Sequence, residues 1–347
     1  MTNLQSYEEI HIVGIGGAGM SAIARILRAR GFAVHGSDLR DSPLTATLRD
    51  EGVPVAIGHV AENIGAADLV LASSAIPDDN VELVAAREAG VPVKRRPDFL
   101  SDLTEGYKVI AVAGAHGKTT VTGMLTLLLI DAGLDPTYIV GGVLENLGTN
   151  ARAGEGDYFV IEADEYRNTF LALEPSIAVV TNVEFDHPDC FPGLRFVRLA
   201  FGDFVDNIVE DGVLVACNDD KVAHAIGASF HANGGHLRLY GRHKGKGLDW
   251  QAVNIHPNLR GGVSFTALHN DAPVGELHLK LPGAHNAVNA LAALSVASEL
   301  GIEWTQAKVS LERFEGTARR FEVLGEAGDV IVVDDYAHHP TQIRAVL

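Results

Sequence analysis

The sequence contains few cysteines, which excludes a fold built on disulfides. Only Cys190 and Cys217 occur among 347 residues, whereas small disulfide-rich folds depend on several paired cysteines. The two are also too far apart in the sequence to form the closely spaced cysteine pair of a zinc site. Free thiols suit a reducing compartment, so we expect a cytoplasmic protein.

Long apolar runs and an excess of positive charge are also missing. No apolar stretch reaches the roughly 18 residues of a membrane span, so we expect no membrane association. The 45 acidic and 27 basic residues give a net charge of −18, which disfavours nonspecific binding to nucleic acid or to anionic lipid. The charge does not exclude an anionic substrate, because local loops and helix ends can supply positive potential. With 47% hydrophobic residues, the chain can form two or three domain cores.

The most informative stretch is Ala-Gly-Ala-His-Gly-Lys-Thr-Thr at residues 113–120. It follows an apolar run at 109–112, typical of a buried strand, and precedes an apolar helix predicted over 121–132. A glycine loop between strand and helix, ending in Gly-Lys-Thr, favours a phosphate-binding loop with Mg²⁺ at the threonine. Val112 stands where the common motif has its first glycine, so the loop is a shorter variant. The alternative is a chance glycine turn before a core helix.

A second glycine loop lies near the N-terminus. Gly14, Gly16 and Gly19 fit G-x-G-x-x-G after a short strand, and Asp38 ends the next strand. This pattern places a pyrophosphate at a helix N-terminus, although the glycines could serve strand–helix packing alone. If this loop binds a dinucleotide, the expected function is that of an NAD-dependent oxidoreductase. Two phosphate loops instead favour one nucleotide as energy donor and another as a handle on the substrate.

Acidic residues follow two further predicted strands of the central region. The strand at 158–161 leads into Glu162 and Glu165, and the strand at 177–181 leads into Glu184 and His187. Glu162 lies closest to its strand, so we expect it to ligate Mg²⁺. The pattern alone favours Glu165 and Glu184 as solvated strand ends and His187 as an ordinary loop histidine.

Strands alternate with helices through most of the chain, which predicts parallel α/β sheets. Residues 250–281 alternate polar and apolar, which indicates an antiparallel patch inserted in the second domain, and 284–300 form a helix. At the start of this helix Asn286 could read a base edge, but its spacing favours a helix cap. We expect domains at 1–105, 106–316 and 317–347. The last begins with a strand at 330–335 and stops at residue 347, so we expect it to be incomplete.

Several ordered motifs resemble the Mur ligases of peptidoglycan synthesis, and the resemblance covers essentially the whole chain. It rests on the two glycine loops, Ser73–Ile76, Glu162–Glu165, Asn182–His187, Gly283–Asn289, Arg319–Glu322 and Asp334–Pro340. The resemblance implies an α/β fold with a Rossmann-like N-terminal domain, a central P-loop ATPase domain with an antiparallel insertion, and the start of a truncated Rossmann-like C-terminal domain. It also implies a ligase that uses ATP and Mg²⁺, closest to the branch that joins L-alanine to UDP-N-acetylmuramate.

The resemblance also assigns site residues. The catalytic residues would be Lys118, Glu162 and His187, and the metal ligands Thr119, Glu162 and His187. The ATP-binding residues would be Gly114, His116, Gly117, Lys118, Thr119, Thr120, His285, Asn289, Arg320, Asp335 and Tyr336. The substrate-binding residues would be Gly14, Gly16, Gly17, Gly19, Met20, Asp38, Ser73, Ser74 and, near the amino acid, His338.

The sequence departs from the L-alanine branch in two ways. Tyr166 stands where many members of that branch have serine, and the related tripeptide-recycling ligase also has tyrosine there. Most of the third domain is absent after Leu347, so we expect this chain to bind the UDP-sugar and to ligate poorly. The sequence leaves the oligomeric state and the amino-acid specificity open.

Overall fold

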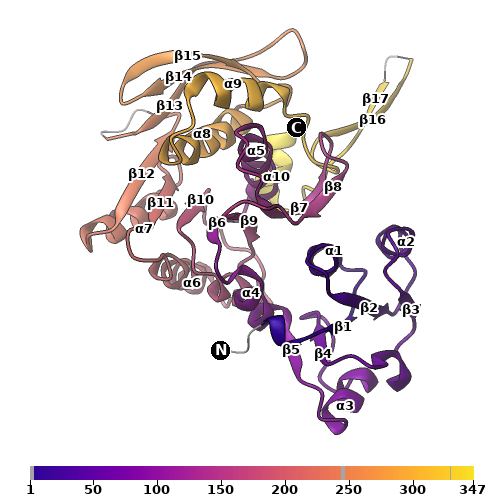
Figure 1. The fold of residues 1–347 in the computed structure, drawn as a ribbon. Coiled ribbons are helices and arrows are strands. Elements are labelled where there is room, and N and C mark those ends of the chain that lie inside the picture. Colours follow the sequence, from indigo (N-terminus) through magenta and orange to yellow (C-terminus); the bar gives the residue numbers. More distant parts are fainter. Residues whose placement is uncertain (1–3, 244–246, 329) are drawn as a thin grey trace. The chain divides into compact units, whose positions relative to one another are not determined.

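The computed structural model describes residues 4–243, 247–328 and 330–347, which form two compact units (Figure 1). Of these described residues, the first unit comprises 4–107, 137–141 and 150–155, and the second comprises 108–136, 142–149 and the part of the chain from 156 onward. Both units combine helices with largely parallel sheets, which confirms the predicted α/β class. The division into three domains stays a prediction.

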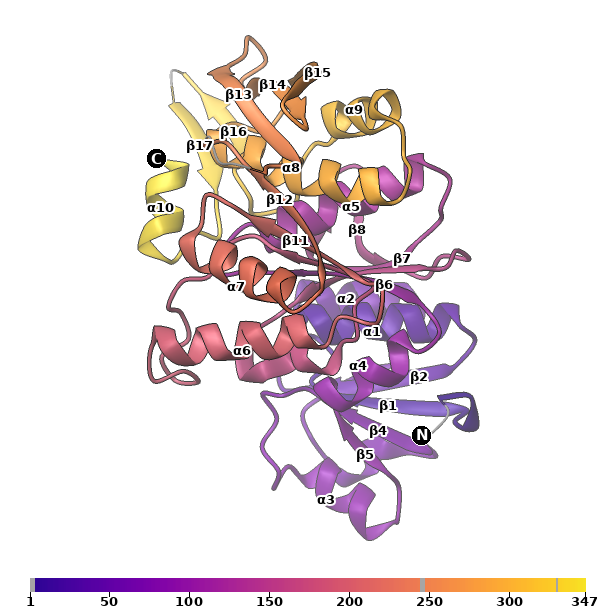
Figure 2. The same cartoon turned by 90° about the vertical axis from the view of Figure 1, so that its left-hand side faces the viewer.

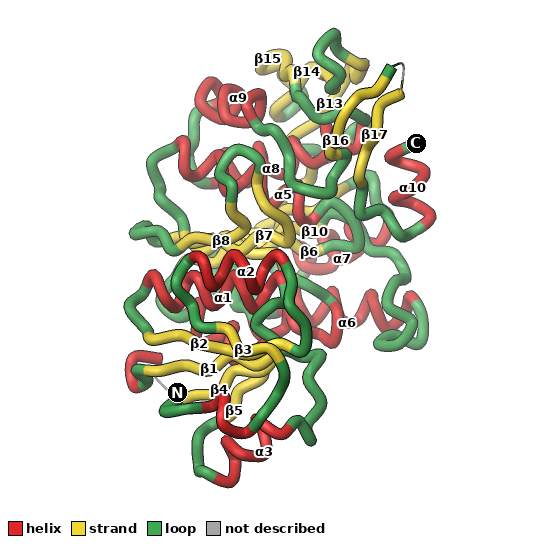
Figure 3. Tube along the Cα trace, turned by 90° about the vertical axis from the view of Figure 1, so that its right-hand side faces the viewer, coloured by secondary structure: helices red, strands yellow, loops and turns green. Residues whose placement is uncertain are grey.

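The first unit is a five-stranded parallel sheet in the order β3-β2-β1-β4-β5. Its strands are β1 Glu9–Val13, β2 Ala33–Asp38, β3 Val55–Ile57, β4 Leu69–Ala72 and β5 Val93–Arg95, and its helices are α1 Ala18–Ala29, α2 Pro43–Asp50, α3 Val81–Glu88 and α4 Arg96–Thr104. Helices α1 and α2 lie on one face of the sheet and α3 on the other (Figure 3). The strand order reverses at β1, where open α/β sheets bind their ligands.

The second unit is built on a ten-stranded sheet in the order β15-β14-β13-β12-β11-β10-β6-β9-β7-β8, of which residues 137–141 of β7 and 150–152 of β8 are counted with the first unit. Its strands are β6 Lys108–Ala113, β7 Thr137–Leu144, β8 Thr149–Arg152, β9 Tyr158–Ala163, β10 Ile177–Val180, β11 Val213–Cys217, β12 His236–Gly241, β13 Trp250–Pro257, β14 Val263–His269 and β15 Ala272–His278. Its helices are α5 Lys118–Asp131, α6 Leu194–Asp206, α7 Lys221–Ala232, α8 Ala284–Glu299 and α9 Trp304–Arg313. Helices α5 and α8 cover one face, and α6 and α7 cover the other (Figure 2).

Helix α5 shows why this unit has a continuous core. Eleven of its fourteen residues are buried, because it lies between the sheet and the helices α8 and α9. A helix that is apolar all round is stable only in such a position. The antiparallel strands β13–β15 extend one edge of the same sheet, and β13 pairs with β12 in parallel.

The C-terminal segment forms a small separate sheet. Strand β17 (Val330–Asp334) was predicted, whereas its antiparallel partner β16 (Glu322–Ala327) was not. Helix α10 (Pro340–Val346) follows. Across the described residues, every helix is too short or too polar to cross a membrane.

The strand register determines where the loops of the second unit meet. Ala113 at the end of β6 lies opposite Ala163 of β9 and opposite Val180 of β10. The loops that follow these three strands therefore leave the same edge of the sheet. Glu165 and Glu184 belong to these loops, and Glu162 lies at the end of β9.

Candidate nucleotide-binding and catalytic site

Glycine is required at two positions in the loop between β6 and α5. Gly114 has φ +144°, and a Cβ there would lie 2.0 Å from Thr181 Oγ1. Gly117 has φ +80°, a left-handed conformation that other residues seldom adopt. A Cβ on Gly117 would lie 2.7 Å from Asn289 Oδ1, so the loop also runs directly against α8.

The loop is fastened to the segment after β10 and leaves the start of α5 open. The N–H of His116 donates to Asn182 Oδ1 at 2.8 Å, and its carbonyl accepts from Thr181 Oγ1 at 2.6 Å. Gly117 precedes α5 without providing a side-chain cap, so the first-turn N–H groups, including those of Thr119 and Thr120, can receive an anion. The sequence patterns above predict no role for Thr181 and Asn182, and their position after the neighbouring strand is the one signal that points to this contact.

Lys118 is held inside this site by a carboxylate. Its Nζ donates to the Gly114 carbonyl at 2.5 Å and to Glu165 Oε2 at 2.8 Å. Burial would lower the pKa of Lys118, but the carboxylates of Glu165, Asp164 and Glu162 outweigh burial and raise it. The prediction that Glu165 is a solvated strand end is wrong, because its side chain is only 4% exposed.

His187 lies on the other side of Glu165. Its Nε2 is 3.9 Å from Glu165 Oε1, and its ring meets the Tyr166 ring edge-on at 5.1 Å between centroids. Arg167, Asn168 and His187 all have positive φ, between 52° and 56°. Non-glycine residues in this conformation store backbone strain and cluster at functional sites.

Glu184 connects the phosphate loop to the C-terminal segment. Gln342 Oε1 accepts from the N–H groups of His338 and His339, so its amide Nε2 faces His116 Nδ1 at 2.9 Å and donates to it. His116 therefore carries its proton on Nε2 and donates to Glu184 Oε2 at 2.9 Å, while Thr341 Oγ1 donates to Glu184 Oε1 at 3.2 Å.

These contacts correct the expectation that Glu184 is a solvated strand end. Burial would raise the pKa of Glu184, but the hydrogen bonds from His116 and Thr341 outweigh burial and lower it. Ligand atoms of His116, Glu184 and His339 lie within 4.8 Å of one another, a spacing that a metal ion could use. The hydrogen bonds already engage His116 at both ring nitrogens, so we interpret the group as a bridge between the loop and α10.

Several residues predicted to bind ATP belong to α8 and the C-terminal segment. Arg320 Nη2 lies 3.3 Å from Thr119 Oγ1, and its guanidinium lies 5.3 Å from the Tyr336 ring centroid. Burial lowers the pKa of His285, whereas the negative charge of Asp335 acts to raise it. The Asp335 carboxylate therefore lies near the His285 ring. The Asp335 oxygens accept from backbone N–H groups of Phe321 and Ala337.

Asn286 does not cap α8. The helix begins at Ala284, so Gly283 takes the capping position and Asn286 is its third residue. The Asn286 amide donates to the Pro282 carbonyl at 2.6 Å and accepts from Asn289 Nδ2 at 3.1 Å. Asn286 therefore orients Asn289 toward Gly117. His338 lies beside the His187 loop, with Nε2 4.0 Å from Asp186 Oδ2.

The glycine loop of the first unit is braced without a lysine. Asp38 Oδ2 accepts the N–H of Gly16 at 2.9 Å, and the Ser37 carbonyl accepts the N–H groups of Gly14 and Ile15. Gly17 precedes α1 without a side-chain cap, which leaves that helix N-terminus open. A Cβ on Gly19 would lie 2.8 Å from the Arg96 guanidinium, so a cation stands near the first turn.

The other predicted substrate residues also belong to this unit. Ser73 follows β4, and its N–H donates to the Val13 carbonyl at 3.0 Å, which places it and the adjacent Ser74 beside the strand that enters the loop. A Cβ on Gly14 would lie 3.1 Å from Ser73 Cβ. Met20 is buried, so it supports the loop from inside the core.

A buried hydrogen-bond network centred on the Glu82 carboxylate also contacts the residues that hold this loop. Glu82 is fully buried, with Oε2 bound by His11 Nε2 at 3.0 Å and by Ser37 Oγ at 2.6 Å. Asn63 Nδ2 donates to Oε1 at 2.6 Å. Burial would raise the pKa of Glu82, but these hydrogen bonds outweigh it and lower the pKa to about 2. Ser37 thus joins a charged core residue to the loop.

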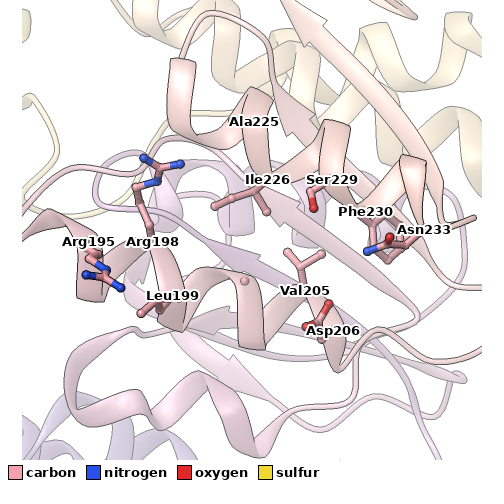
Figure 4. A pocket seen from close by; sticks show the side chains of 11 residues that line it. Arg195, Arg198, Leu199, Val205, Asp206, Ala225, Ile226, Ser229, Phe230 and Asn233 are labelled. Carbon is pink, nitrogen blue, oxygen red and sulfur yellow. The ribbon is translucent and has the colours of Figure 1, made fainter.

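A groove that lies elsewhere, between α6 and α7, is another candidate (Figure 4). Its volume is about 580 Å³, and Arg195, Arg198, Ile226, Ser229 and Phe230 are among the side chains that line it. It contains none of the predicted site residues. The loops after β6, β9 and β10 contain a buried ion pair and residues with strained backbone. They are therefore the better candidate for the functional site.

A parallel α/β unit with a glycine loop, a buried Gly-Lys-Thr lysine and acids at the same strand edge defines a P-loop-type, nucleotide-dependent enzyme. Two family models match the chain: the Mur ligase family catalytic domain over residues 9–108 and the Mur ligase middle domain over residues 112–297. The chain belongs to the Mur ligase family. Its members are ATP-dependent amide-forming ligases, so the predicted enzyme class and the use of ATP are confirmed.

Individual relatives agree with this assignment. UDP-N-acetylmuramate–L-alanine ligase of Paenarthrobacter aurescens is 46% identical over 100% of this chain and 75% of its own length. The structure of UDP-N-acetylmuramate-alanine ligase from Thermotoga maritima has a TM-score of 0.86 at 32% identity, covering 98% of this chain and 76% of that one. The UDP-N-acetylmuramate:L-alanyl-γ-D-glutamyl-meso-diaminopimelate ligase from Neisseria meningitides has a TM-score of 0.79 at 30% identity, covering 90% and 99%.

Proposed function

We propose that this chain carries the ATP-dependent ligation of L-alanine to the lactyl carboxylate of UDP-N-acetylmuramate, a step of peptidoglycan precursor synthesis in the cytoplasm. The observation that carries the proposal is the position of Lys118. It lies at the open start of α5, among the acids that follow β9 and next to the His187 loop. The choice of L-alanine rests on the similarity to relatives with that name.

The reaction would proceed through an acyl phosphate. The lactyl carboxylate attacks the γ-phosphorus, its oxygen forms the new P–O bond, and the bond to the β-phosphate oxygen breaks to release ADP. The amine of L-alanine then attacks the acyl carbon, the carbon–oxygen bond to phosphate breaks, and the nitrogen loses a proton. Phosphoryl transfer depends chiefly on positioning and on neutralising charge. Lys118 and the first-turn N–H groups of α5 would supply both.

The residues present fit a divalent cation. Thr119 offers a hydroxyl, Glu162 a half-buried carboxylate and His187 an imidazole, and their segments leave one sheet edge. Oxygen donors with few nitrogen ligands suit Mg²⁺. When bound, the ion would neutralise negative charge on the phosphates. The metal roles of these three residues are part of this proposal.

The first unit would bind the uridine diphosphate of the substrate. Its glycine loop presents backbone N–H groups at the start of α1, and Asp38 is already engaged in holding Gly16. An acid that binds a ribose hydroxyl in a dinucleotide site is here used within the loop. The arrangement therefore supports a pyrophosphate handle and gives no support to hydride transfer.

The tripeptide-recycling ligase is the alternative that a specific observation favours. Tyr166 packs against His187 and donates its hydroxyl to Asp189 Oδ2 at 3.0 Å. The tripeptide-recycling ligase also has tyrosine at this position. Among the solved structures, the L-alanine ligase of Thermotoga maritima and the Neisseria tripeptide ligase are 32% and 30% identical to this chain, with TM-scores of 0.86 and 0.79. The curated relative that is 46% identical has the L-alanine name, so we retain L-alanine.

Phosphate release tests the proposal. The 347-residue chain would be supplied with ATP, Mg²⁺ and UDP-N-acetylmuramate, and then with L-alanine, glycine, L-serine or the tripeptide in parallel. We expect binding of both nucleotides and the largest acceptor-dependent release with L-alanine, even if turnover is slow. A larger response to the tripeptide would establish the alternative. Failure to bind ATP, or reduction of NAD, would reject the ligase.

A further inference from the structure

The ammonium of Lys118 is paired with a carboxylate of the protein itself. Its ammonium contacts Glu165 Oε2 at 2.8 Å and the Gly114 carbonyl at 2.5 Å. Both partners of this ion pair are largely buried, with side-chain exposures of 17% and 4%. A phosphate-binding lysine must face its ligand, so any phosphate that reaches Lys118 has to compete with Glu165.

The carboxylate is held in place by a rigid turn. The N–H of Asn168 donates to the Glu165 carbonyl at 2.9 Å, and the N–H of Phe170 donates to the Asp164 carbonyl at 3.0 Å. Phe170 is fully buried and stacks on Phe204 at 4.9 Å between ring centroids. The turn therefore stays near the phosphate loop, and only the Glu165 side chain is free to change partners.

The surroundings determine which new partner is available. The second oxygen of Glu165 lies 3.9 Å from His187 Nε2, and Glu162 and Asp164 are close enough to raise the pKa of Lys118. A polyphosphate entering without a cation would meet three carboxylates. Like charges in a partly buried site repel strongly, whereas a divalent cation would remove the repulsion and attract the Glu165 carboxylate on the His187 side.

Building on the proposed function, we propose that Glu165 competes with the phosphates of the nucleotide for Lys118 and so makes nucleotide binding depend on a divalent cation. Without metal, Glu165 keeps Lys118 occupied and repels the phosphates. With metal, Lys118 turns to the phosphates and Glu165 faces the cation beside His187. Glu165 is thus a positioning residue for Lys118, distinct from the predicted metal ligand Glu162.

ADP binding in the presence of EDTA and of Mg²⁺ tests this inference, because it requires no catalysis. The wild type should bind ADP much more tightly with Mg²⁺. Glu165→Gln keeps the side-chain shape and removes the charge, so we expect metal-free affinity to rise about fivefold, the upper end of the range for one ion pair. The ratio of metal-free to metal-bound dissociation constants should fall by the same factor or more.

Two variants separate the contact from a general charge effect. Glu174→Gln removes the same charge at an exposed position on the same segment and should leave both affinities unchanged. Asp164→Asn removes a charge from the same group of carboxylates, at a residue whose Oδ1 accepts the backbone N–H of Tyr166, so its metal-free affinity should rise less than that of Glu165→Gln. An equal rise in Asp164→Asn would overturn the role of the contact.

Folding and the underlying function are checked separately. If Glu165→Gln does not fold by circular dichroism, Glu165→Asp shortens the reach to Lys118 and should still raise metal-free affinity by a smaller factor. Unchanged or weaker metal-free binding in the folded variant overturns the inference. Lys118→Ala should lose ADP binding; if it does not, the proposed nucleotide site itself fails.

Discussion

The two glycine loops of this chain share a backbone design and differ in their side chains. Each follows a parallel strand, contains a left-handed glycine and ends at an uncapped helix N-terminus. The first loop is braced by Asp38 and by the Ser37 carbonyl. The second contains Lys118, faces Glu165 and lies near His187 and Glu184.

This difference shows how one structural element serves two purposes. A helix N-terminus with backbone N–H groups suffices to bind a pyrophosphate that does not react. Phosphoryl transfer additionally requires mobile positive charge and acids that hold a cation. Substitutions in the first loop should therefore affect binding of the UDP-sugar, and substitutions in the second should affect ATP.

The largest effect is expected from Lys118→Ala. Loss of the only lysine in the second loop should lower ATP turnover by about a thousandfold or more, because one preorganised charge contact contributes that much. Binding of UDP-N-acetylmuramate should not change. Lys108→Ala, exposed at the start of the preceding strand β6, is the control. Near-normal ATP turnover in Lys118→Ala would remove the distinction between the loops.

Glu162→Ala should have the next largest effect. Loss of a metal ligand should raise the Mg²⁺ concentration needed for ATP turnover or binding, by roughly ten- to a hundredfold. A Mg²⁺ titration of the variant beside Glu174→Ala measures this directly. An unchanged titration would show that Glu162 does not hold the cation.

Acid should weaken the first unit through Glu82. Its folded-state pKa of about 2 lies below the ordinary value of 4.5, so ionised Glu82 stabilises the fold above about pH 5. That contribution, about 3 kcal/mol, is lost as the pH falls from about 5 to 2. The free energy of unfolding, measured with denaturant at several pH values in this range, should fall in the wild type. It should fall equally in the exposed control Glu88→Gln. Glu82→Gln should not show this decrease. An equal dependence of the free energy of unfolding on pH in the wild type and in Glu82→Gln would contradict the low pKa of Glu82.

The smallest effect is expected from Asp38→Ala. Gly16 would lose its charged acceptor, and one such hydrogen bond contributes about 1.5–3 kcal/mol at most. We expect the dissociation constant for UDP-N-acetylmuramate to rise about tenfold, with ATP binding unchanged. Asp50→Ala, exposed on α2, is the matched control in calorimetric titrations. A loss of ATP affinity in Asp38→Ala would contradict the claim that the first loop affects only the binding of the UDP-sugar.

Much of the fold followed from local sequence signals. The apolar strands β6 and β9 and the helices α5 and α8 were predicted within a few residues, because long apolar segments between glycines have few alternatives. The more polar strands β8, β12 and β16 were missed. Their pairing depends on neighbouring strands, which one sequence does not reveal.

The candidate site was predicted less completely, for physical reasons. Glu165 and Glu184 follow strands like any solvated acid, and only the turn through Arg167 and Asn168 and the approach of α10 bury them. Asn286 has the residue type of a cap, but the helix starts too early for it to act as one. Long-range packing decided each of these outcomes.

A crystal structure with Mn²⁺ and a nonhydrolysable ATP analogue would test the central claim most directly. We predict phosphate oxygens on the first-turn N–H groups of α5, Lys118 turned from Glu165 to the phosphates, and the metal held among Thr119, Glu162 and His187. An analogue bound elsewhere, with the Lys118–Glu165 pair intact, would contradict the account.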